Sequence, residues 1–180
     1  MTDTEASDLI RTNYLDTSRK TVWADLGAGS GTFTRALAGL LQPGSTIYAI
    51  DTDKKALKTI PNLRHQVKIE TYVADFIRDE LPLPKIDGFL MANSLHYVSD
   101  QIAFLEKMSG YLMEVNDLLI IEYDTDTPNA PWVPYPVSYR SLTNLVERIG
   151  YQTIHKLRER DSIYGNATLY SALATRRNIR

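Results

Sequence analysis

The stretch VWADLGAGSGTFT, residues 22–34, decides how this chain is expected to fold. Its first five residues form an apolar run typical of a short buried strand, and apolar residues then recur at helical spacing from Phe33 to Leu41. The turn between strand and helix consists only of small residues: Gly27, Ala28, Gly29, Ser30 and Gly31. Such a turn leaves its main chain bare, so a ligand can approach it closely.

The rest of the chain repeats this strand-then-helix order. Strands are expected at 21–26, 46–51, 67–76, 85–93, 117–124, 151–161 and 166–176, and helices at 32–41, 54–60, 98–112 and 138–150. Ser99 is the expected N-cap of the third helix, and Gly150 the residue that ends the fourth. Strand–helix alternation predicts a mainly parallel sheet covered on both faces. The last two strands meet around Tyr164-Gly165-Asn166 as a hairpin, which adds an antiparallel edge.

The 180 residues suit one domain spanning residues 1–180, with a short lead at 1–20 that is helical or flexible. Residues 125–137 are rich in proline and are expected to be irregular. This loop follows the strand at 117–124, so we expect it to border a substrate pocket at the carboxyl edge of the sheet. Trp132 and Tyr135 are its aromatic residues.

Composition excludes several classes of protein. The chain is 43% hydrophobic with a net charge of −2, so the total charge indicates neither nucleic acid nor an acidic membrane as partner. It has no cysteine, and its three histidines lack ligand spacing, so no metal site is expected. Neither a signal peptide nor an apolar run of membrane-spanning length is evident. We therefore expect a cytoplasmic protein.

Two aspartates end the strands that follow the glycine turn. Asp51 lies 24 residues after Gly27, where a carboxylate can accept hydrogen bonds from both hydroxyls of a ribose. Asp75 ends the next strand, where it can accept from an adenine amino group while the N–H of Phe76 donates to a ring nitrogen. Alternatively, both aspartates cap the segments that follow them. Thr32 occupies the position where a dinucleotide-binding turn needs a third small residue, which disfavours a nicotinamide-dependent reductase.

Four segments together resemble the successive motifs of class I S-adenosylmethionine-dependent methyltransferases: VWADLGAGSGTFT, IYAIDTD, YVADF and DGFLMANSLHYV. The resemblance covers roughly residues 20–176. It implies a three-layer Rossmann-like fold with a seven-stranded, mostly parallel sheet in the order 3-2-1-4-5-7-6, strand 7 being antiparallel. It also implies S-adenosylmethionine as cofactor and S-adenosylhomocysteine as product.

The resemblance further implies a role for each matching residue. Asp25 would support the ammonium group of the cofactor directly or through water, and Asn93 would lie near its methionine part and the sulfonium. Thr52 would pack on the adenine, although family members often have an apolar residue there. The implied cofactor-binding residues are Asp25, Gly27, Ala28, Gly29, Ser30, Asp51, Thr52, Asp75, Phe76 and Asn93.

Methyl transfer is an in-line displacement, and it needs a general base only when the acceptor arrives protonated. His96, just after the fourth strand, is the candidate base. Tyr97, Trp132 and Tyr135 are the candidate acceptor-binding residues. The run Asn93-Ser94-Leu95-His96 lacks the prolines typical of enzymes that methylate the exocyclic amines of bases, so that reaction is disfavoured.

The sequence thus favours a methyltransferase with a small-molecule acceptor, no membrane association and no nucleic-acid partner. Two alternatives stay open. A protein or RNA acceptor could dock on the open face, helped by six Lys/Arg against two acidic residues in 156–180. The chain could instead be a non-catalytic S-adenosylmethionine-binding regulator. The oligomeric state is open, a homodimer included.

Overall fold

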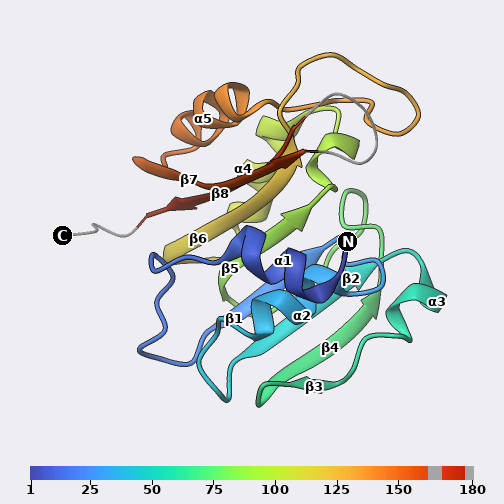
Figure 1. Ribbon diagram of the computed structural model, residues 1–180, viewed down its shortest axis with the longest axis vertical. Coiled ribbons are helices and arrows are strands. Elements are labelled where there is room, and N and C mark those ends of the chain that lie inside the picture. The colour runs from blue at the N-terminus through green and yellow to red at the C-terminus, as the bar shows by residue number, and fades with distance from the viewer. Residues whose placement is uncertain (162–167, 177–180) are drawn as a thin grey trace.

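One mixed sheet runs through the part of the chain that the computed structural model describes, residues 1–161 and 168–176 (Figure 1). Eight strands in this part follow the spatial order β3-β4-β2-β1-β5-β6-β8-β7. Their bounds are β1 Val22–Leu26, β2 Thr46–Asp51, β3 Leu63–Arg64, β4 Val67–Val73, β5 Ile86–Ala92, β6 Leu112–Tyr123, β7 Thr153–Asp161 and β8 Thr168–Thr175. The helices are α1 Asp3–Ile10, α2 Thr32–Ala38, α3 Lys54–Leu57, the 3-10 turn η1 Leu95–Tyr97, α4 Gln101–Ser109 and α5 Tyr139–Arg148.

The predicted sheet order is confirmed, with one addition. The five strands β4, β2, β1, β5 and β6 are parallel neighbours, while β8 pairs antiparallel with both β6 and β7. The addition is β3, a two-residue strand that pairs antiparallel with β4 at the edge. A strand of that length has too few residues to show an alternating pattern, which is why the sequence gave no sign of it.

Two hydrophobic clusters lie on opposite faces of the sheet. Along β6, Leu118 and Ile120 belong to one cluster, and Leu119 and Ile121 belong to the other. This alternation follows from the two-residue period of a strand, and it means that β6 is buried on both faces. Helices therefore cover both sides, as the sequence predicts.

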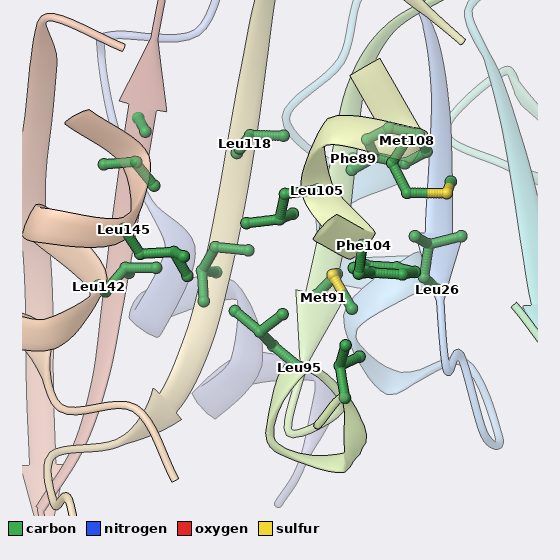
Figure 2. Close-up of a cluster of buried hydrophobic side chains, with 14 of the residues drawn as sticks. Leu26, Phe89, Met91, Leu95, Phe104, Leu105, Met108, Leu118, Leu142 and Leu145 are labelled. Atoms are coloured by element: carbon green, nitrogen blue, oxygen red, sulfur yellow. The ribbon is translucent and has the colours of Figure 1, made fainter. Parts of the chain in front are cut away.

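Helices α4 and α5 cover the first face. Figure 2 shows their leucines, Phe104 and Met108 packed against side chains of β1, β5 and β6. On the other face, α1 and α2 bury a second apolar set: Ala6, Leu9, Ile10, Ala36, Leu37 and Ala38. Because helices cover both faces of the sheet, a ligand-binding site is expected at the carboxyl ends of the parallel strands.

Several predicted boundaries are wrong by a few residues. The helix expected at 98–112 is α4, which begins at Gln101, because Asp100 rather than Ser99 caps it by accepting from the N–H of Ala103 at 3.0 Å. The helix expected at 54–60 ends at Leu57. Strand β6 begins at Leu112, five residues before the expected start at 117. The predicted hairpin turn around 164–166 lies outside the described residues.

Residues 125–137 contain no helix or strand, as predicted. The end of this loop is fixed by Asp126, whose carboxylate accepts from both the N–H and the hydroxyl of Ser138 at 3.0 and 2.9 Å. Ser138 in turn caps α5. Among the described residues, no helix is both long enough and apolar enough to cross a membrane.

Candidate functional site

A cavity of about 530 Å³ lies at the carboxyl ends of the parallel strands. It is bounded by the glycine turn, the end of β5, the end of β6, the last residues of β7 and the start of α1. Its lining residues are Met1, Glu5, Asp25, Gly27, Ala28, Gly29, Ser30, Thr32, Phe33, Ala92, Asn93, Tyr123, Arg160, Asp161 and Leu169. Six of the predicted cofactor residues are among them: Asp25, Gly27, Ala28, Gly29, Ser30 and Asn93.

The amides of the glycine turn point toward β2. The N–H groups of Gly27 and Ala28 both donate to the carbonyl oxygen of Ile50, at 2.8 and 3.0 Å. The N–H of Gly29 donates to Oδ2 of Asp51 at 2.7 Å. Three successive donors are therefore used within the protein and are not presented to an anion.

The three glycines of the turn have positive φ angles but different surroundings. A Cβ on Gly27 would lie 2.6 Å from Cβ of Ser94, and one on Gly31 would lie 2.7 Å from Cγ1 of Ile60. A Cβ on Gly29 would meet no described atom within 4 Å. Packing therefore requires glycine at 27 and 31, whereas Gly29 (φ 53°) is the position where bare main chain faces open space.

Asp25 is a buried carboxyl group in the floor of the cavity. It lies on β1 and is 1% exposed, and its Oδ2 accepts from the hydroxyl of Thr34 on α2 at 2.5 Å. Burial raises the pKa of Asp25 to about 7; the Thr34 hydrogen bond opposes this rise, and the nearby charge of Asp51 adds to it. A cationic group placed in the cavity would stabilise the ionised form.

Asn93 follows β5 with a φ of 54°, a left-handed conformation that asparagine tolerates better than most residues. Its Oδ1 is buried and has no hydrogen-bond partner among the described atoms. Leaving a buried acceptor unpaired costs about 1–3 kcal/mol. Asn93 itself lines the cavity, and its contact with a cofactor stays a prediction.

Asp75 and Phe76 follow β4, outside the cavity lining. Oδ1 of Asp75 accepts from the N–H groups of Ile77 and Arg78 at 3.0 and 3.3 Å, so this aspartate caps its own turn. The ring of Phe76 packs edge-on against Phe104 with centroids 5.8 Å apart. Thr52 is exposed. Contacts of these residues and of Asp51 with an adenosine stay predictions.

His96 lies in η1 and is paired with a carboxylate that the sequence analysis did not single out. Its Nδ1 is 2.6 Å from Oε2 of Glu122, and its backbone N–H donates to Oε1 of the same residue at 3.2 Å. Both side chains are buried, at 3% and 1% exposure. The sequence did carry a signal for this pair. Glu122 directly follows four apolar residues of β6, Leu118 to Ile121, and a carboxylate buried among apolar side chains needs a partner.

The predicted acceptor-binding residues lie outside the cavity lining. Tyr97, Trp132 and Tyr135 are 47%, 71% and 46% exposed. The N–H of Tyr135 donates to the carbonyl of His96 at 3.0 Å, so the loop is attached beside η1. Their contact with an acceptor stays a prediction. The rest of the cavity wall is formed by residues that the sequence analysis missed, among them Tyr123 of β6 and Leu169 of β8.

Helix α1 contributes to this wall and is held by two ion pairs. Asp3 binds Arg35 of α2 through two contacts of 2.8 Å. Glu5 binds Arg160 of β7 at 3.2 Å, and both Glu5 and Arg160 line the cavity. The predicted lead at 1–20 is thus helical over Asp3–Ile10. No group of three or more potential metal-ligating side chains was found among residues 1–161 and 168–176.

A family model described as "Methyltransferase domain" matches residues 24–114, a span that runs from within β1 to the start of β6 and includes the glycine turn. The chain belongs to the methyltransferase domain family. The predicted family, enzyme class and fold are therefore confirmed. A search among curated proteins found no match.

Solved structures with the same fold include several methyltransferases. The N-terminal domain of EvdMO1 with S-adenosylhomocysteine bound has a TM-score of 0.66 and 20% identity, over 96% of this chain and 81% of that one. The plantazolicin methyltransferase BpumL in complex with S-adenosylhomocysteine has a TM-score of 0.66 and 14% identity, over 97% and 84%. A methyltransferase from Aquifex aeolicus has a TM-score of 0.60 and 18% identity, over 97% and 98%. Compared with the longer EvdMO1 chain, this chain spans 37% of its length.

Proposed function

We propose that this protein transfers a methyl group from S-adenosylmethionine to a small-molecule acceptor, with residues 1–180 acting as one methyltransferase domain. The observation that carries the proposal is the glycine turn, where Gly29 faces open space while the amides of residues 27–29 are bonded to β2. Such a turn suits a ligand that needs close approach to the main chain without phosphate binding. A cytoplasmic location belongs to the same proposal, and fractionation of the producing cells tests it.

The residues of the cavity fit the methionine part of this cofactor. Oδ1 of Asn93 is a buried acceptor without a partner, so an ammonium group can donate to it. Asp25 in the cavity floor would be ionised by a nearby cation. When bound, S-adenosylmethionine supplies a methyl group attached to a cationic sulfur. Asp161 also lines the cavity, whereas the charge of Glu5 is paired with that of Arg160.

The adenosine part is proposed to lie against the ends of β2 and β4. The carboxylate of Asp51 would accept from the ribose hydroxyls, and Asp75 with the N–H of Phe76 would bind the adenine edge. Asp75 already accepts two main-chain hydrogen bonds on Oδ1, which leaves Oδ2 for a ligand amino group apart from its 3.5 Å contact with Arg78. Because the N–H of Phe76 would share the adenine contact, we expect Asp51 to contribute more to affinity than Asp75.

The acceptor is proposed to bind in the part of the cavity beyond the glycine turn. The lining there includes Phe33, Tyr123, Leu169 and the Glu5–Arg160 ion pair of α1 and β7. A volume of about 530 Å³ is in the range of small-molecule sites, so a small acceptor can fit beside part of a cofactor. Contacts with these residues would orient the acceptor.

His96 is the proposed general base, with Glu122 as its positioning residue. A carboxylate accepts hydrogen bonds, so the 2.6 Å contact with Glu122 favours the tautomer that carries its hydrogen on Nδ1, and Nε2 is then the nitrogen that would accept a proton. The second bond, from the N–H of His96 to Oε1, fixes the backbone of η1 to the end of β6. The base is required only for acceptors that arrive protonated.

Calorimetric titration with S-adenosylhomocysteine, NAD and ATP tests the cofactor assignment. We expect binding of S-adenosylhomocysteine alone, because the turn offers few free amides to phosphates. Binding of NAD more tightly than S-adenosylhomocysteine would contradict the proposal. Transfer of radiolabelled methyl groups from S-adenosylmethionine into a panel of small metabolites then tests catalysis. Tight cofactor binding without transfer to any acceptor would favour the non-catalytic regulator.

A macromolecular acceptor is the second candidate, because Trp132, Tyr97 and Tyr135 are exposed beside the site. If protein or RNA binds there, Trp132→Ala should weaken its binding and leave cofactor affinity unchanged. Binding to a polyanion would also fall steeply with salt. The opposite outcome has two parts: Trp132→Ala turns over a small acceptor at the wild-type rate, and that rate does not depend on salt. Together they would exclude a macromolecular acceptor.

A further inference from the structure

The carboxylate of Asp51 serves two main-chain donors at once. Oδ2 accepts from the N–H of Gly29 at 2.7 Å, and Oδ1 accepts from the N–H of Asp53 at 2.8 Å. A carboxylate has roughly four lone-pair positions, so about two are left for other donors. That number matches the two hydroxyls of a ribose.

The bond to Gly29 differs from the other bonds of the turn. Gly27 and Ala28 are held by the carbonyl of Ile50, a main-chain contact that any side chain at position 50 would preserve. Gly29 is the residue of the three that depends on a side chain. Its conformation has a positive φ, and no described atom lies within 4 Å of the position that its Cβ would occupy. Side-chain packing therefore does not hold Gly29 on its open side.

We propose that Asp51 is a positioning residue for the glycine turn as well as the acceptor for the cofactor ribose. Its contact with Gly29 is present in the structure, and only its contact with the ribose rests on the proposed function. The same carboxylate then links the two halves of the cofactor site: it fixes Gly29 beside the methionine part and accepts from the ribose of the adenosine part. Loss of the carboxylate disturbs both halves.

Asparagine cannot replace Asp51 in this arrangement. Its amide has one oxygen and one NH₂ group, so it would turn a donor toward the N–H of either Gly29 or Asp53. Asp51→Asn therefore removes one main-chain hydrogen bond without a large change in volume. Asp53→Asn is the matched control, because Asp53 is exposed, carries the same charge and bonds to Lys55 and Ala56 rather than to the turn.

Amide hydrogen exchange in ¹⁵N-labelled protein without ligand tests the contact with Gly29. We expect the Gly29 amide to exchange about tenfold faster or more in Asp51→Ala, which loses both main-chain bonds, than in the wild type, as for a lost hydrogen bond to a charged group. In Asp53→Asn the Gly29 amide should exchange at the wild-type rate. The remaining amide signals report whether each variant is folded. Equal Gly29 exchange in wild type and Asp51→Ala would overturn the proposal.

A ligand series separates the two roles of Asp51. S-adenosylhomocysteine and its 2′,3′-dideoxy analogue are titrated into wild type and Asp51→Ala. If Asp51 also positions the turn, the variant weakens binding of both ligands; loss of affinity for S-adenosylhomocysteine alone would mean a ribose contact only. If wild-type protein binds neither ligand, the proposed function fails, while the exchange experiment still decides the contact with Gly29.

Discussion

Glu122 holds His96 through two contacts, 2.6 Å to the ring Nδ1 and 3.2 Å to the backbone N–H, with both side chains buried. The two residues are 26 positions apart, at the ends of η1 and β6. The pair therefore joins the loop after β5 to the strand beside it. Tyr135 bonds to the carbonyl of His96, so the proline-rich loop depends on the same anchor.

Glu122→Ala should destabilise the protein by about 3–5 kcal/mol, because it leaves one member of a buried pair without its partner. Glu122→Gln should cost less, since the amide oxygen can still accept from His96. Urea unfolding measures both. Glu106→Ala, at an exposed position of α4, is the control and should change stability by less than about 0.5 kcal/mol. A loss in Glu122→Ala as small as in the control would refute a stabilising pair.

His96→Gln should reduce turnover by about 10²-fold or more for an acceptor that must lose a proton, with little change in cofactor affinity. The acidic limb of the pH–rate profile should disappear with it. Steady-state rates across a pH series, with calorimetry for cofactor binding, provide the measurement. A variant with normal turnover and an unchanged profile would show that the acceptor ionises without His96.

Binding of S-adenosylhomocysteine should strengthen as pH rises from 6 to 8. The pKa of Asp25 is about 7 because the group is buried, and a bound ammonium favours its ionised form. Below this pKa the affinity should change by at most about tenfold per pH unit, since one proton is released. Calorimetry in buffers of different ionisation enthalpy detects that proton. Asp25→Asn should abolish the release; wild type and variant releasing the same number of protons would contradict the role of Asp25.

The same carboxyl group should make stability without ligand fall as pH rises. The pKa of Asp25 is raised by folding from 3.8 to about 7, so between these values the folded state holds a proton that the unfolded state has lost. The stabilisation is complete below about pH 4 and is gone above about pH 7, and its upper bound is roughly 4 kcal/mol. The difference in unfolding free energy between wild type and Asp25→Asn, measured across this range, isolates the effect. A difference that does not vary with pH would disprove it.

Gly27→Ala should cost more stability than Gly29→Ala, because both positions have a positive φ but only position 27 is also crowded. In Gly27→Ala the new methyl group would lie 2.6 Å from Cβ of Ser94, so we expect a loss of about 1–3 kcal/mol in stability from overpacking. In Gly29→Ala the methyl group meets open space, so stability should fall only by the roughly 1–2 kcal/mol of a left-handed non-glycine residue.

Cofactor binding completes this comparison. The side chain at position 29 would occupy the space proposed for the cofactor, so Gly29→Ala should weaken binding of S-adenosylhomocysteine and Gly29→Val should abolish it. Urea unfolding and calorimetry on the three variants provide the measurements. A folded Gly29→Val protein with wild-type affinity would rule out close approach at this turn.

Features encoded within a few consecutive residues were predictable. Five of the strands expected from apolar runs lie within a few residues of their predicted places, because a buried strand needs a local run of apolar side chains. The exposed main chain of the turn could likewise be predicted from five consecutive small residues, Gly27 to Gly31. Helix ends were less predictable, since Ser99 and Asp100 are both good caps and only the backbone path selects Asp100.

Only the tertiary structure distinguishes residues whose local patterns are alike. Gly27 and Gly29 belong to the same run of small residues. Ser94 packs against Gly27, whereas open space lies beside Gly29. Glu5 and Arg160 are 155 positions apart, and no pattern within either segment predicts that they meet. A side chain's environment is set by whatever the folded chain brings beside it. The sequence therefore determined the fold, the family and the bare turn, while packing of distant segments decided which residues surround the cavity.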